Sequence, residues 1–575
     1  MPLKFLRVGV LALLGVLLLV VPGNAATSGE WTKNQFSEKG SHGHPKFSDN
    51  GEYLVVLEQR GVASTGKVWL LSADSGQTVW KFNEKKKSYY DADISDDGSY
   101  IAAAGGELAL FSKDSGAPLW RFSPKGTVYN RVAMSGNGQY IAVGTRSGEV
   151  RLFKNDAAKE LYKWKVCKDS VEALAISNDG NYIVAGGLGK MVLIQRDRNA
   201  IINTYDVKKK NGKADKVMSV AISGDGQKYT AATYDGLMYL FDRDYSKPFW
   251  TANSGTNVKL RTAVSDNGNN IVLVSDRKYW GFTADSAKSK WNFVNKGRFP
   301  DLDMSTSGKY IAVADAMNTV YVFDRDFTND HEETRPIRTY DSVFPGSISM
   351  SGQGDKIVYD EKAGLKFRAV SPSVLTELKD SVAVYRTDDT MQVRTFVSDP
   401  GGPGDKLYKL EVHLSLPQMD FWKIAGRAVK KKLESVVPKE ISNAVSKLAG
   451  DQLPSVEDSV PYAMPVGVVR PGSFDQTLNI TVPKLNGEAE DKGWMGKFDI
   501  IGKAFGYFND LLKEVLPANM ANWITDATKA YFTGESSMQS GMQPSIGLGQ
   551  VFLKDYVTGE VIDSDTFVFV YIMEG

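Results

Sequence analysis

The sequence has only one cysteine, Cys167, so no disulfide can form within the chain. Histidine is also scarce, with four residues in the chain, none of them near Cys167 in sequence. A catalytic cysteine needs a base close by, so a half-buried structural role is the better interpretation. Neither sign of charge is in excess, because the chain has 69 Lys and Arg residues and 68 Asp and Glu residues. This balance gives no reason to expect a nucleic-acid partner.

Long apolar runs are confined to the N-terminus. Lys4 and Arg7 precede an apolar stretch from Val8 to Val21, and small residues follow up to Ala26. The stretch is shorter than the roughly 20 residues that span a bilayer, and the pattern is typical of a signal peptide. We therefore predict a signal peptide over residues 1–26 and an extracytoplasmic protein that is secreted, periplasmic or on the cell surface. An uncleaved anchor is the alternative.

What the sequence does contain is a repeat, in which a Ser is followed three residues later by a Gly. Its eight copies begin at Ser48, Ser95, Ser135, Ser177, Ser223, Ser265, Ser305 and Ser351, which are 40 to 47 residues apart. An apolar strand precedes each copy, and a β-prone strand such as Tyr100 to Ala103 follows it. A Gly that tolerates positive φ suits a tight turn between two antiparallel strands.

Two further strands complete each repeat. Strands such as Leu108 to Phe111 come next, followed by a polar turn and a strand with an aromatic residue: Asp74-Ser-Gly76 precedes Trp80, and Asp114-Ser-Gly116 precedes Trp120. Four antiparallel strands in each repeat predict a propeller blade. The fold class is therefore mainly β, with a β-propeller of about eight four-stranded blades over residues 30–380.

The blade number and the closing strand are open at this point. The fifth, sixth and eighth copies replace the usual Tyr after the turn by Lys228, Asn270 and Lys356, so seven blades is the alternative. The segment from Trp31 to Phe36 could complete the last blade and close the ring. The competing segment runs from Val374 to Lys379.

The turn, the Tyr-Ile strand and the period resemble WD-repeat propellers, although the Trp-Asp dipeptide is absent. The Asp-Ser-Gly-x-x-x-Trp segments at 74–80 and 114–120 resemble the tryptophan-docking motifs of pyrroloquinoline-quinone-type propellers. The resemblance covers residues 30–380 and implies the propeller fold. Quinoprotein dehydrogenases of that type use a disulfide between neighbouring cysteines, which a single cysteine cannot make. We therefore expect no cofactor.

Residues 382–575 carry no copy of the repeat and predict a β-sandwich-like domain with helical insertions. The predicted strands cover Val382 to Thr387, Leu407 to Leu416, Val466 to Val469, Thr477 to Val482, Leu548 to Leu553 and Thr566 to Ile572. The predicted helices cover Asp420 to Val437, Trp494 to Leu516 and Ala518 to Phe532. These helices could pack on the sheets, or those at 420–437 and 494–532 could make a peripheral membrane contact.

The sequence carries no clear catalytic or metal-binding motif. A hydrolase domain would need a Gly-x-Ser-x-Gly elbow, and residues 382–575 have none; a P-loop is also missing. His42 and His44 could place two imidazoles on one side of a strand, but no Cys or carboxylate cluster accompanies them. We expect neither a metal site nor an enzyme.

Aligning the repeats gives one candidate site, at the mouth of the central channel. The position four residues before each anchor Ser holds His44, Asp91, Arg131, Ala173, Ser219, Arg261, Asp301 and Ser347. Asp93 and Asp303 lie two residues further along and should point the same way. We predict ligand or partner binding by Asp91, Arg131, Arg261, Asp301, Asp93 and Asp303. Alternatively, these residues form ion pairs that hold neighbouring inner strands together.

These features favour an exported, non-enzymatic binding or scaffold protein of the cell envelope. Its propeller face would recognise a protein or a surface ligand. One alternative is an extracytoplasmic hydrolase or lyase with its site at the channel mouth. Another is a self-assembling cell-surface component that associates through aromatic helix residues such as Phe505 and Trp523.

Overall fold

The computed structural model divides the chain into two units, Met1–Ser371 and Pro372–Gly575. It describes residues 30–34, 42–59, 67–84, 88–209, 211–255, 260–275, 277–294, 301–315, 318–328, 334–342, 346–361, 364–370, 372–378, 384–386, 390–400, 407–415, 461–469, 474–481 and 542–574. The predicted signal peptide and the predicted helices at 420–437, 494–516 and 518–532 lie outside these residues. No helix of the described part is long and apolar enough to cross a membrane.

The described part of the first unit contains eight four-stranded antiparallel sheets, numbered here as blades 1 to 8. Blades 1 to 4 consist of β2 (His42–Phe47), β3 (Tyr53–Gln59), β4 (Lys67–Ser72) and β5 (Thr78–Phe82); β6 (Tyr89–Ile94), β7 (Tyr100–Gly105), β8 (Leu108–Ser112) and β9 (Ser115–Phe122); β10 (Tyr129–Met134), β11 (Tyr140–Thr145), β12 (Glu149–Lys154) and β13 (Glu160–Lys165); and β14 (Ala173–Ile176), β15 (Tyr182–Gly186), β16 (Lys190–Gln195) and β17 (Ala200–Asp206).

Blades 5 to 8 continue the series. They consist of β18 (Val217–Ile222), β19 (Lys228–Thr233), β20 (Leu237–Asp242) and β21 (Trp250–Asn253); β22 (Arg261–Val264), β23 (Asn270–Val274), β24 (Lys278–Thr283) and β25 (Trp291–Val294); β26 (Asp301–Met304), β27 (Tyr310–Asp315), β28 (Thr319–Asp324) and β29 (Arg338–Asp341), with the short α2 (Arg325–Thr328) after β28; and β30 (Ile348–Met350), β31 (Lys356–Glu361), β32 (Gly364–Ala369) and β1 (Glu30–Asn34).

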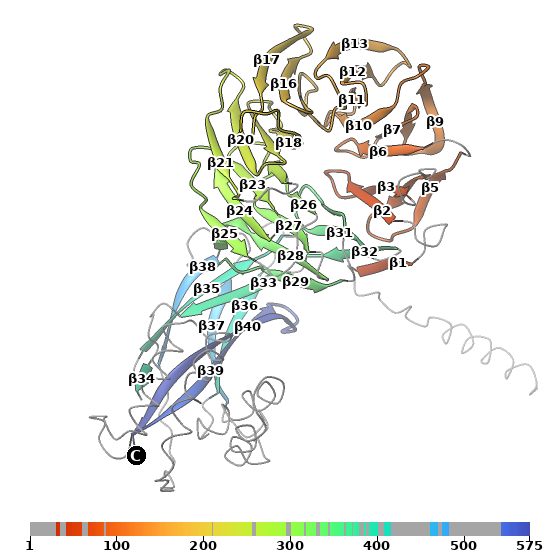
Figure 1. The fold of residues 1–575 in the computed structure, drawn as a ribbon. Coiled ribbons are helices and arrows are strands. Elements are labelled where there is room, and N and C mark those ends of the chain that lie inside the picture. Colours follow the sequence, from red (N-terminus) through yellow and green to blue (C-terminus); the bar gives the residue numbers. More distant parts are fainter. Residues whose placement is uncertain are drawn as a thin grey trace, which may run out of the picture. The chain divides into compact units, whose positions relative to one another are not determined.

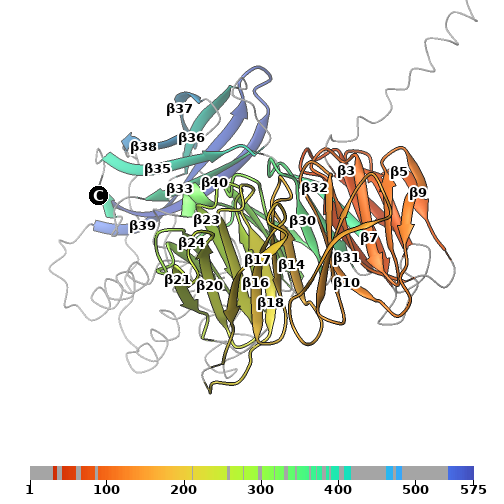
Figure 2. The ribbon, with the colours of Figure 1, turned by 90° about the horizontal axis from the view of Figure 1, so that it is seen from above.

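The innermost strands of the blades form a closed ring. Each of β2, β6, β10, β14, β18, β22, β26 and β30 contacts the next, and β30 contacts β2. Figure 1 shows several of them around the centre, with β5, β9 and β13 at the periphery, and Figure 2 shows the ring from the side. The predicted propeller is confirmed, and it has eight blades among the described residues.

The ring is closed by the N-terminal strand. β1 pairs antiparallel with β32 and so becomes the outermost strand of blade 8. The indole of Trp31 stacks on Phe367 at 5.2 Å between ring centroids, and its Nε1 donates to the carbonyl of Ala73 in blade 1 at 2.6 Å. The competing segment forms β33 (Ser373–Leu378), which pairs with β35 in the second unit. The propeller unit therefore ends at Ser371, earlier than the predicted residue 380.

The turn motif also explains why the variant repeats are true blades. In blade 2, the anchor Gly98 has a φ of +74° and lies against Tyr53 of blade 1; a Cβ on this glycine would come within 2.6 Å of the ring. The aliphatic part of Lys228 takes the place of that Tyr and lies against Gly268 in the same way. Its ammonium pairs with Asp242 at 2.5 Å. A lysine stem thus fills the position of the aromatic ring, provided that its charge is paired.

Tryptophan side chains connect successive blades at the outer strands. Their Nε1 atoms donate to a carbonyl in the turn of the next blade, and the pairs are Trp80 to Lys113 at 3.1 Å, Trp120 to Asn155 at 2.8 Å, Trp250 to Ala284 at 2.9 Å and Trp31 to Ala73. This is the docking contact that the Asp-Ser-Gly-x-x-x-Trp segments predict.

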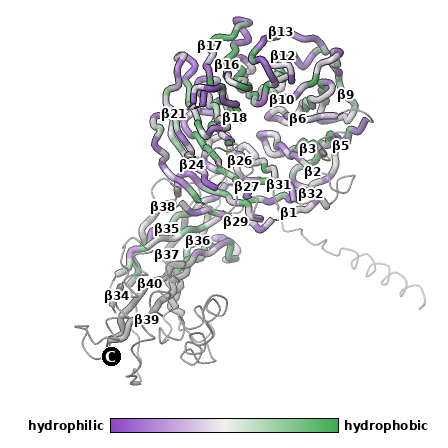
Figure 3. Tube along the Cα trace, viewed as in Figure 1, coloured by the Kyte–Doolittle hydropathy of each residue, from purple (hydrophilic) through white to green (hydrophobic). Residues whose placement is uncertain are grey.

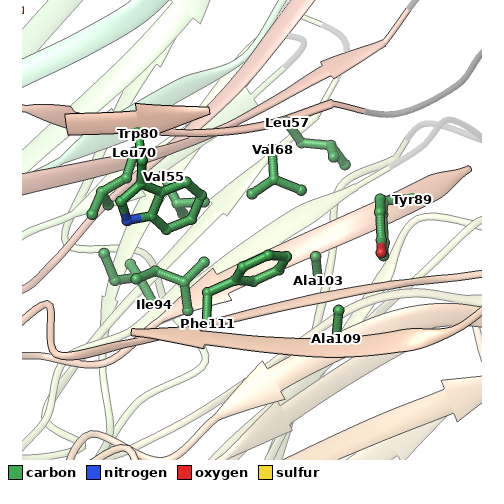
Figure 4. Close-up of a cluster of buried hydrophobic side chains, with 11 residues drawn as sticks. Val55, Leu57, Val68, Leu70, Trp80, Tyr89, Ile94, Ala103, Ala109 and Phe111 are labelled. Carbon is green, nitrogen blue, oxygen red and sulfur yellow. The ribbon is translucent and has the colours of Figure 1, made fainter. Parts of the chain in front are cut away.

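Apolar side chains fill the spaces between blades. Figure 4 shows the cluster between blades 1 and 2, where Val55 and Leu70 face Ala103 and Phe111 around Trp80. The rings of Trp80 and Phe111 stack at 5.3 Å between centroids. Figure 3 shows apolar stretches within the strands throughout the ring. Burial of such side chains stabilises the fold by about 1.5–3 kcal/mol each, and it has to do so without a disulfide.

The second unit is mainly β in its described residues. A three-stranded sheet has the order β33, β35 (Thr390–Ser398) and β38 (Phe474–Thr481). A five-stranded sheet has the order β34 (Val384–Arg386), β40 (Val561–Glu574), β39 (Met542–Asp555), β36 (Tyr408–Ser415) and β37 (Pro461–Val469). Each predicted strand overlaps one of these, whereas β35 was missed. Asp563 and Asp565 of β40 accept the backbone N–H groups of Val374 and Thr376 and so connect the two sheets.

Candidate functional site

A cavity of about 460 Å³ lies at the centre of the ring, where the innermost strands begin. All eight of these strands, or the residue directly before them, contribute to its lining. The predicted site residues Asp91, Arg131, Arg261, Asp301 and Asp303 line the cavity, and Asp93 is 4% exposed on the same strand as Asp91. The cavity therefore brings together side chains that lie up to 212 residues apart in the chain, from Asp91 to Asp303.

Two of the aspartates connect blade 2 to blade 3. The Asp91 carboxylate accepts the backbone N–H of Val132 at 3.0 Å, and the Asp93 carboxylate accepts that of Met134 at 2.8 Å. Both N–H groups belong to β10, on the side that faces the neighbouring blade. The carboxylates thus hold two innermost strands together by hydrogen bonds to the backbone.

The same arrangement connects blade 7 to blade 8. Asp303 accepts the backbone N–H of Met350 at 2.9 Å and the hydroxyl of Ser349 at 3.0 Å. Asp301 accepts the backbone N–H of Ile348 and the hydroxyl of Ser347, both at 3.4 Å. Because hydrogen bonds to a charged acceptor are stronger than neutral ones, these contacts fix the shape of the mouth as well as its charge.

The two arginines have different surroundings. Arg131 donates from Nε to the carbonyl of Glu172 at 2.8 Å and from Nη1 to the carbonyl of Asn130 at 2.7 Å. Arg261 lies with its Nε 3.5 Å from a carboxylate oxygen of Asp301, and its side chain is 33% exposed. Arg131 is therefore held by backbone carbonyls, whereas Arg261 is the arginine that a ligand in the cavity can reach more easily.

Sequence alignment of the repeats overlooked Lys46, which also lines the cavity. Its Nζ forms an ion pair with the Asp93 carboxylate. Burial lowers the pKa of Lys46, but the charges of Asp93, Asp91 and Asp303 raise it more, and the net pKa is raised. The signal was available in the sequence, because Lys46 stands two residues before Ser48, the position that Asp93 and Asp303 hold in their own repeats.

The carboxylates of the mouth are crowded. Burial raises the pKa of Asp303 to about 6, although hydrogen bonds from Met350, Met304 and Ser349 and the charge of Lys46 act in the opposite direction. Burial likewise raises the pKa of Asp91 against the lowering effect of Arg131. Blades 7, 8, 1 and 2 thus form a strongly acidic side of the channel.

Two residues before the anchor Ser, the other half of the ring carries small residues. At the position of Lys46, Asp93 and Asp303, blades 3 to 6 carry Ala133, Ala175, Ala221 and Ala263. The strand register gives these alanines the same inward direction. At this position the charged and hydrogen-bonding groups lie on blades 7, 8, 1 and 2, whereas two residues earlier in the chain Arg131 and Arg261 of blades 3 and 6 also line the cavity.

The opposite end of the channel is narrowed by side chains from the anchor turns. Thr306 donates to Asp49 at 2.8 Å, and Asn178 donates to Asp266 at 2.9 Å. The Asp96 carboxylate lies over Gly136, where a Cβ would come within 2.1 Å of it. Burial and the neighbouring carboxylates, first that of Asp49, raise the pKa of Asp96 to about 6. These contacts place polar side chains across the end of the channel opposite the mouth.

The remaining candidates for chemistry lie apart from one another. His44 lines the cavity, while the Cys167 thiol is buried, and burial raises its pKa. Within the described ranges, no three His, Cys, Asp or Glu side chains are grouped closely enough to hold a metal ion.

Part of the propeller matches a known protein family. Residues 64–215 match the family model described as outer membrane protein assembly factor BamB. The propeller is similar to PQQ-like repeat propellers. The matched residues reach from blade 1 into the connection between blades 4 and 5, and they do not include the second unit. No curated protein matches the chain. The resemblance to WD-repeat propellers stays a prediction.

Proposed function

We propose that this protein is an exported, non-enzymatic scaffold of the cell envelope, and that the propeller mouth binds a segment of a partner protein. The cavity carries this proposal, because carboxylates of blades 2 and 7, held in place by hydrogen bonds, and two arginines of blades 3 and 6 line it together. The match to an outer membrane assembly factor supports a protein partner and an envelope location. The N-terminal segment with Lys4, Arg7 and the apolar run supports export.

A partner segment would enter the cavity at the mouth, where its polar groups would meet Arg261 and the carboxylates of Asp91 and Asp301. The carboxylates already hold neighbouring blades together, so the site is preorganised and little ordering is needed on binding. This division of roles makes Arg261 the residue whose loss affects binding more than folding.

Arg261→Gln should weaken partner binding about tenfold, because one charge-assisted contact in a partly exposed site is worth roughly 1.4 kcal/mol. The measurement is capture from native envelope extract by the immobilised full chain, followed by titration with the captured protein. Arg243→Gln is the matched control, since Arg243 is 26% exposed and pairs with Asp244 away from the cavity.

Equal capture by wild type and Arg261→Gln would remove Arg261 from the binding site. Failure of wild type to capture any protein would contradict the scaffold proposal and favour a small polar ligand or a reaction at the mouth.

A further inference from the structure

One β-hairpin of the second unit carries exposed apolar side chains at its turn. β39 and β40 are joined by a turn at residues 556–560, and Tyr556, Val557 and Val561 are 51%, 89% and 49% exposed. We call these three residues the apolar tip. Large apolar side chains at such exposure are a common feature of surfaces that contact another molecule.

The turn that carries the apolar tip is well ordered. The Asp555 carboxylate accepts the backbone N–H groups of Val557 at 2.9 Å and Thr558 at 2.8 Å. Gly559 donates its backbone N–H to the carbonyl of Asp555 at 2.9 Å and has a φ of +71°. The apolar side chains are therefore presented in a fixed arrangement, which lowers the entropy lost when they dock.

The charge of the tip restricts what it can dock onto. From Lys554 to Asp563, one basic residue is accompanied by three acidic ones, Asp555, Glu560 and Asp563, and Lys554 is itself paired with Glu411 at 2.9 Å. A tip with a net charge of −2 is repelled by an anionic membrane surface. It is suited to an apolar surface flanked by basic residues.

The propeller of the same protein has such a surface on its periphery. Val79, Leu119 and Leu161 on the outermost strands β5, β9 and β13 are 45%, 52% and 42% exposed. They occupy equivalent places, because the residue after each pairs with Leu70, Leu110 and Leu152 of the third strand of its blade. We call these three residues the side-wall row.

Basic residues accompany the side-wall row. Each apolar residue is followed two positions later by Lys81, Arg121 or Lys163, and Lys165 is added in blade 3. Two acidic residues lie among them: Glu84, paired with Arg121, and Glu160, so four basic residues leave a net charge of +2. The outermost strands of blades 4 to 7 carry one basic and two acidic residues, Arg338, Asp206 and Asp341. The combination of exposed apolar and basic side chains is therefore present on the outermost strands of blades 1 to 3 and absent from those of blades 4 to 7 among the described residues.

We infer that the apolar tip of one copy docks on the side-wall row of a second copy. The apolar residues match, and the net charges of −2 and +2 are complementary. Such a contact joins two different surfaces, so a joined pair keeps one free tip and one free side wall for further copies. It is independent of the channel mouth. Because a hairpin tip buries less surface than a standard interface, the Kd should be on the order of 10–100 µM.

Sedimentation velocity on the purified full chain tests this inference. Wild type at about 100 µM should form oligomers that dissociate on dilution and at high salt. The tip variant Val557→Asp should be monomeric, and so should the wall variant Val79→Ser/Leu119→Ser/Leu161→Ser. An equal mixture of the two variants should form a dimer and stop there, because one intact tip meets one intact wall. Unchanged thermal unfolding of each variant would show that folding is preserved.

A matched triple variant provides the control. Leu188→Ser/Phe249→Ser/Val294→Ser removes three apolar side chains of similar exposure outside the side-wall row and should assemble like wild type. The inference is wrong if wild type stays monomeric at about 100 µM, or if the mixed variants do not pair. Flotation of wild type, but not Val557→Asp, with phosphatidylcholine vesicles would assign the tip to a lipid surface instead.

Discussion

Trp31→Ala should lower the free energy of unfolding of the propeller by about 3 kcal/mol or more. Trp31 contributes stacking on Phe367 and a hydrogen bond to the Ala73 carbonyl, and its ring lies against Gly76, where a Cβ would come within 2.6 Å. It also belongs to β1. Among the described blades, β1 is the one outermost strand that comes from the N-terminal end of the unit while the other three strands of its blade come from the C-terminal end. Its loss therefore weakens the junction that closes the ring as well as one packing site.

Urea unfolding followed by tryptophan fluorescence and by circular dichroism measures this effect. Trp250→Ala is the control, because Trp250 makes the same kind of bond, to Ala284 at 2.9 Å, from a strand that is continuous with its own blade. The Trp31 variant should lose more stability than the Trp250 variant. If blade 8 opens first, the transitions seen by fluorescence and by circular dichroism should have different urea midpoints. Equal losses in the two variants would show that closure has no special role.

The fold could be predicted from the sequence to the extent that local chemistry repeats. Ser-x-x-Gly turns and Asp-Ser-Gly-x-x-x-Trp segments identify blades because each needs a specific backbone conformation or a specific partner in the next blade. Trp31 could be proposed for closure on the same grounds. The choice between it and Val374 to Lys379 could not be made, because either segment can form an edge strand and the pairing depends on the whole ring.

The residues of the candidate site could be predicted from the sequence, but the hydrogen bonds that they form could not. The repeats place Asp91, Asp93, Asp301 and Asp303 in the channel by register alone. That their carboxylates accept backbone N–H groups of the next blade depends on the spacing between innermost strands, which the sequence does not give. Lys46 holds the position of Asp93 and Asp303 in its own repeat, but its pairing with the Asp93 carboxylate likewise depends on how the blades are spaced.

In the second unit there is no repeat to compare, and each strand had to be recognised by itself. β35 (Thr390–Ser398) alternates imperfectly between polar and apolar residues, and it was missed. Other strands separate it from its neighbours in the sequence, β34 from β33 and both β36 and β37 from β38, so no hairpin signal accompanies it.

The stability of the propeller should depend on pH through Asp303. Its pKa is raised by burial to about 6 from the ordinary value of 3.8, so the folded state holds this proton more tightly than the unfolded state does. The protonated form therefore favours folding, and this contribution is present below about pH 4 and lost as pH rises through about 6. The total change is roughly 3 kcal/mol at most.

Comparison of wild type with Asp303→Asn isolates this group, because Asp96, which also has a pKa of about 6, is present in both and cancels. The unfolding free energy of wild type relative to the variant should fall as pH rises from about 4 through about 6, and it should be constant above about pH 7. Asp303→Ala should show the same trend if the amide rearranges. Asp285 has a pKa lowered by the Thr283 hydroxyl, so its linkage lies below the ordinary pKa, and Asp285→Asn should give a constant difference over this range. A pH-independent difference for Asp303→Asn as well would contradict this prediction. It would mean that the pKa of Asp303 is the same in the folded and unfolded states, with the charge of Lys46 offsetting the effect of burial.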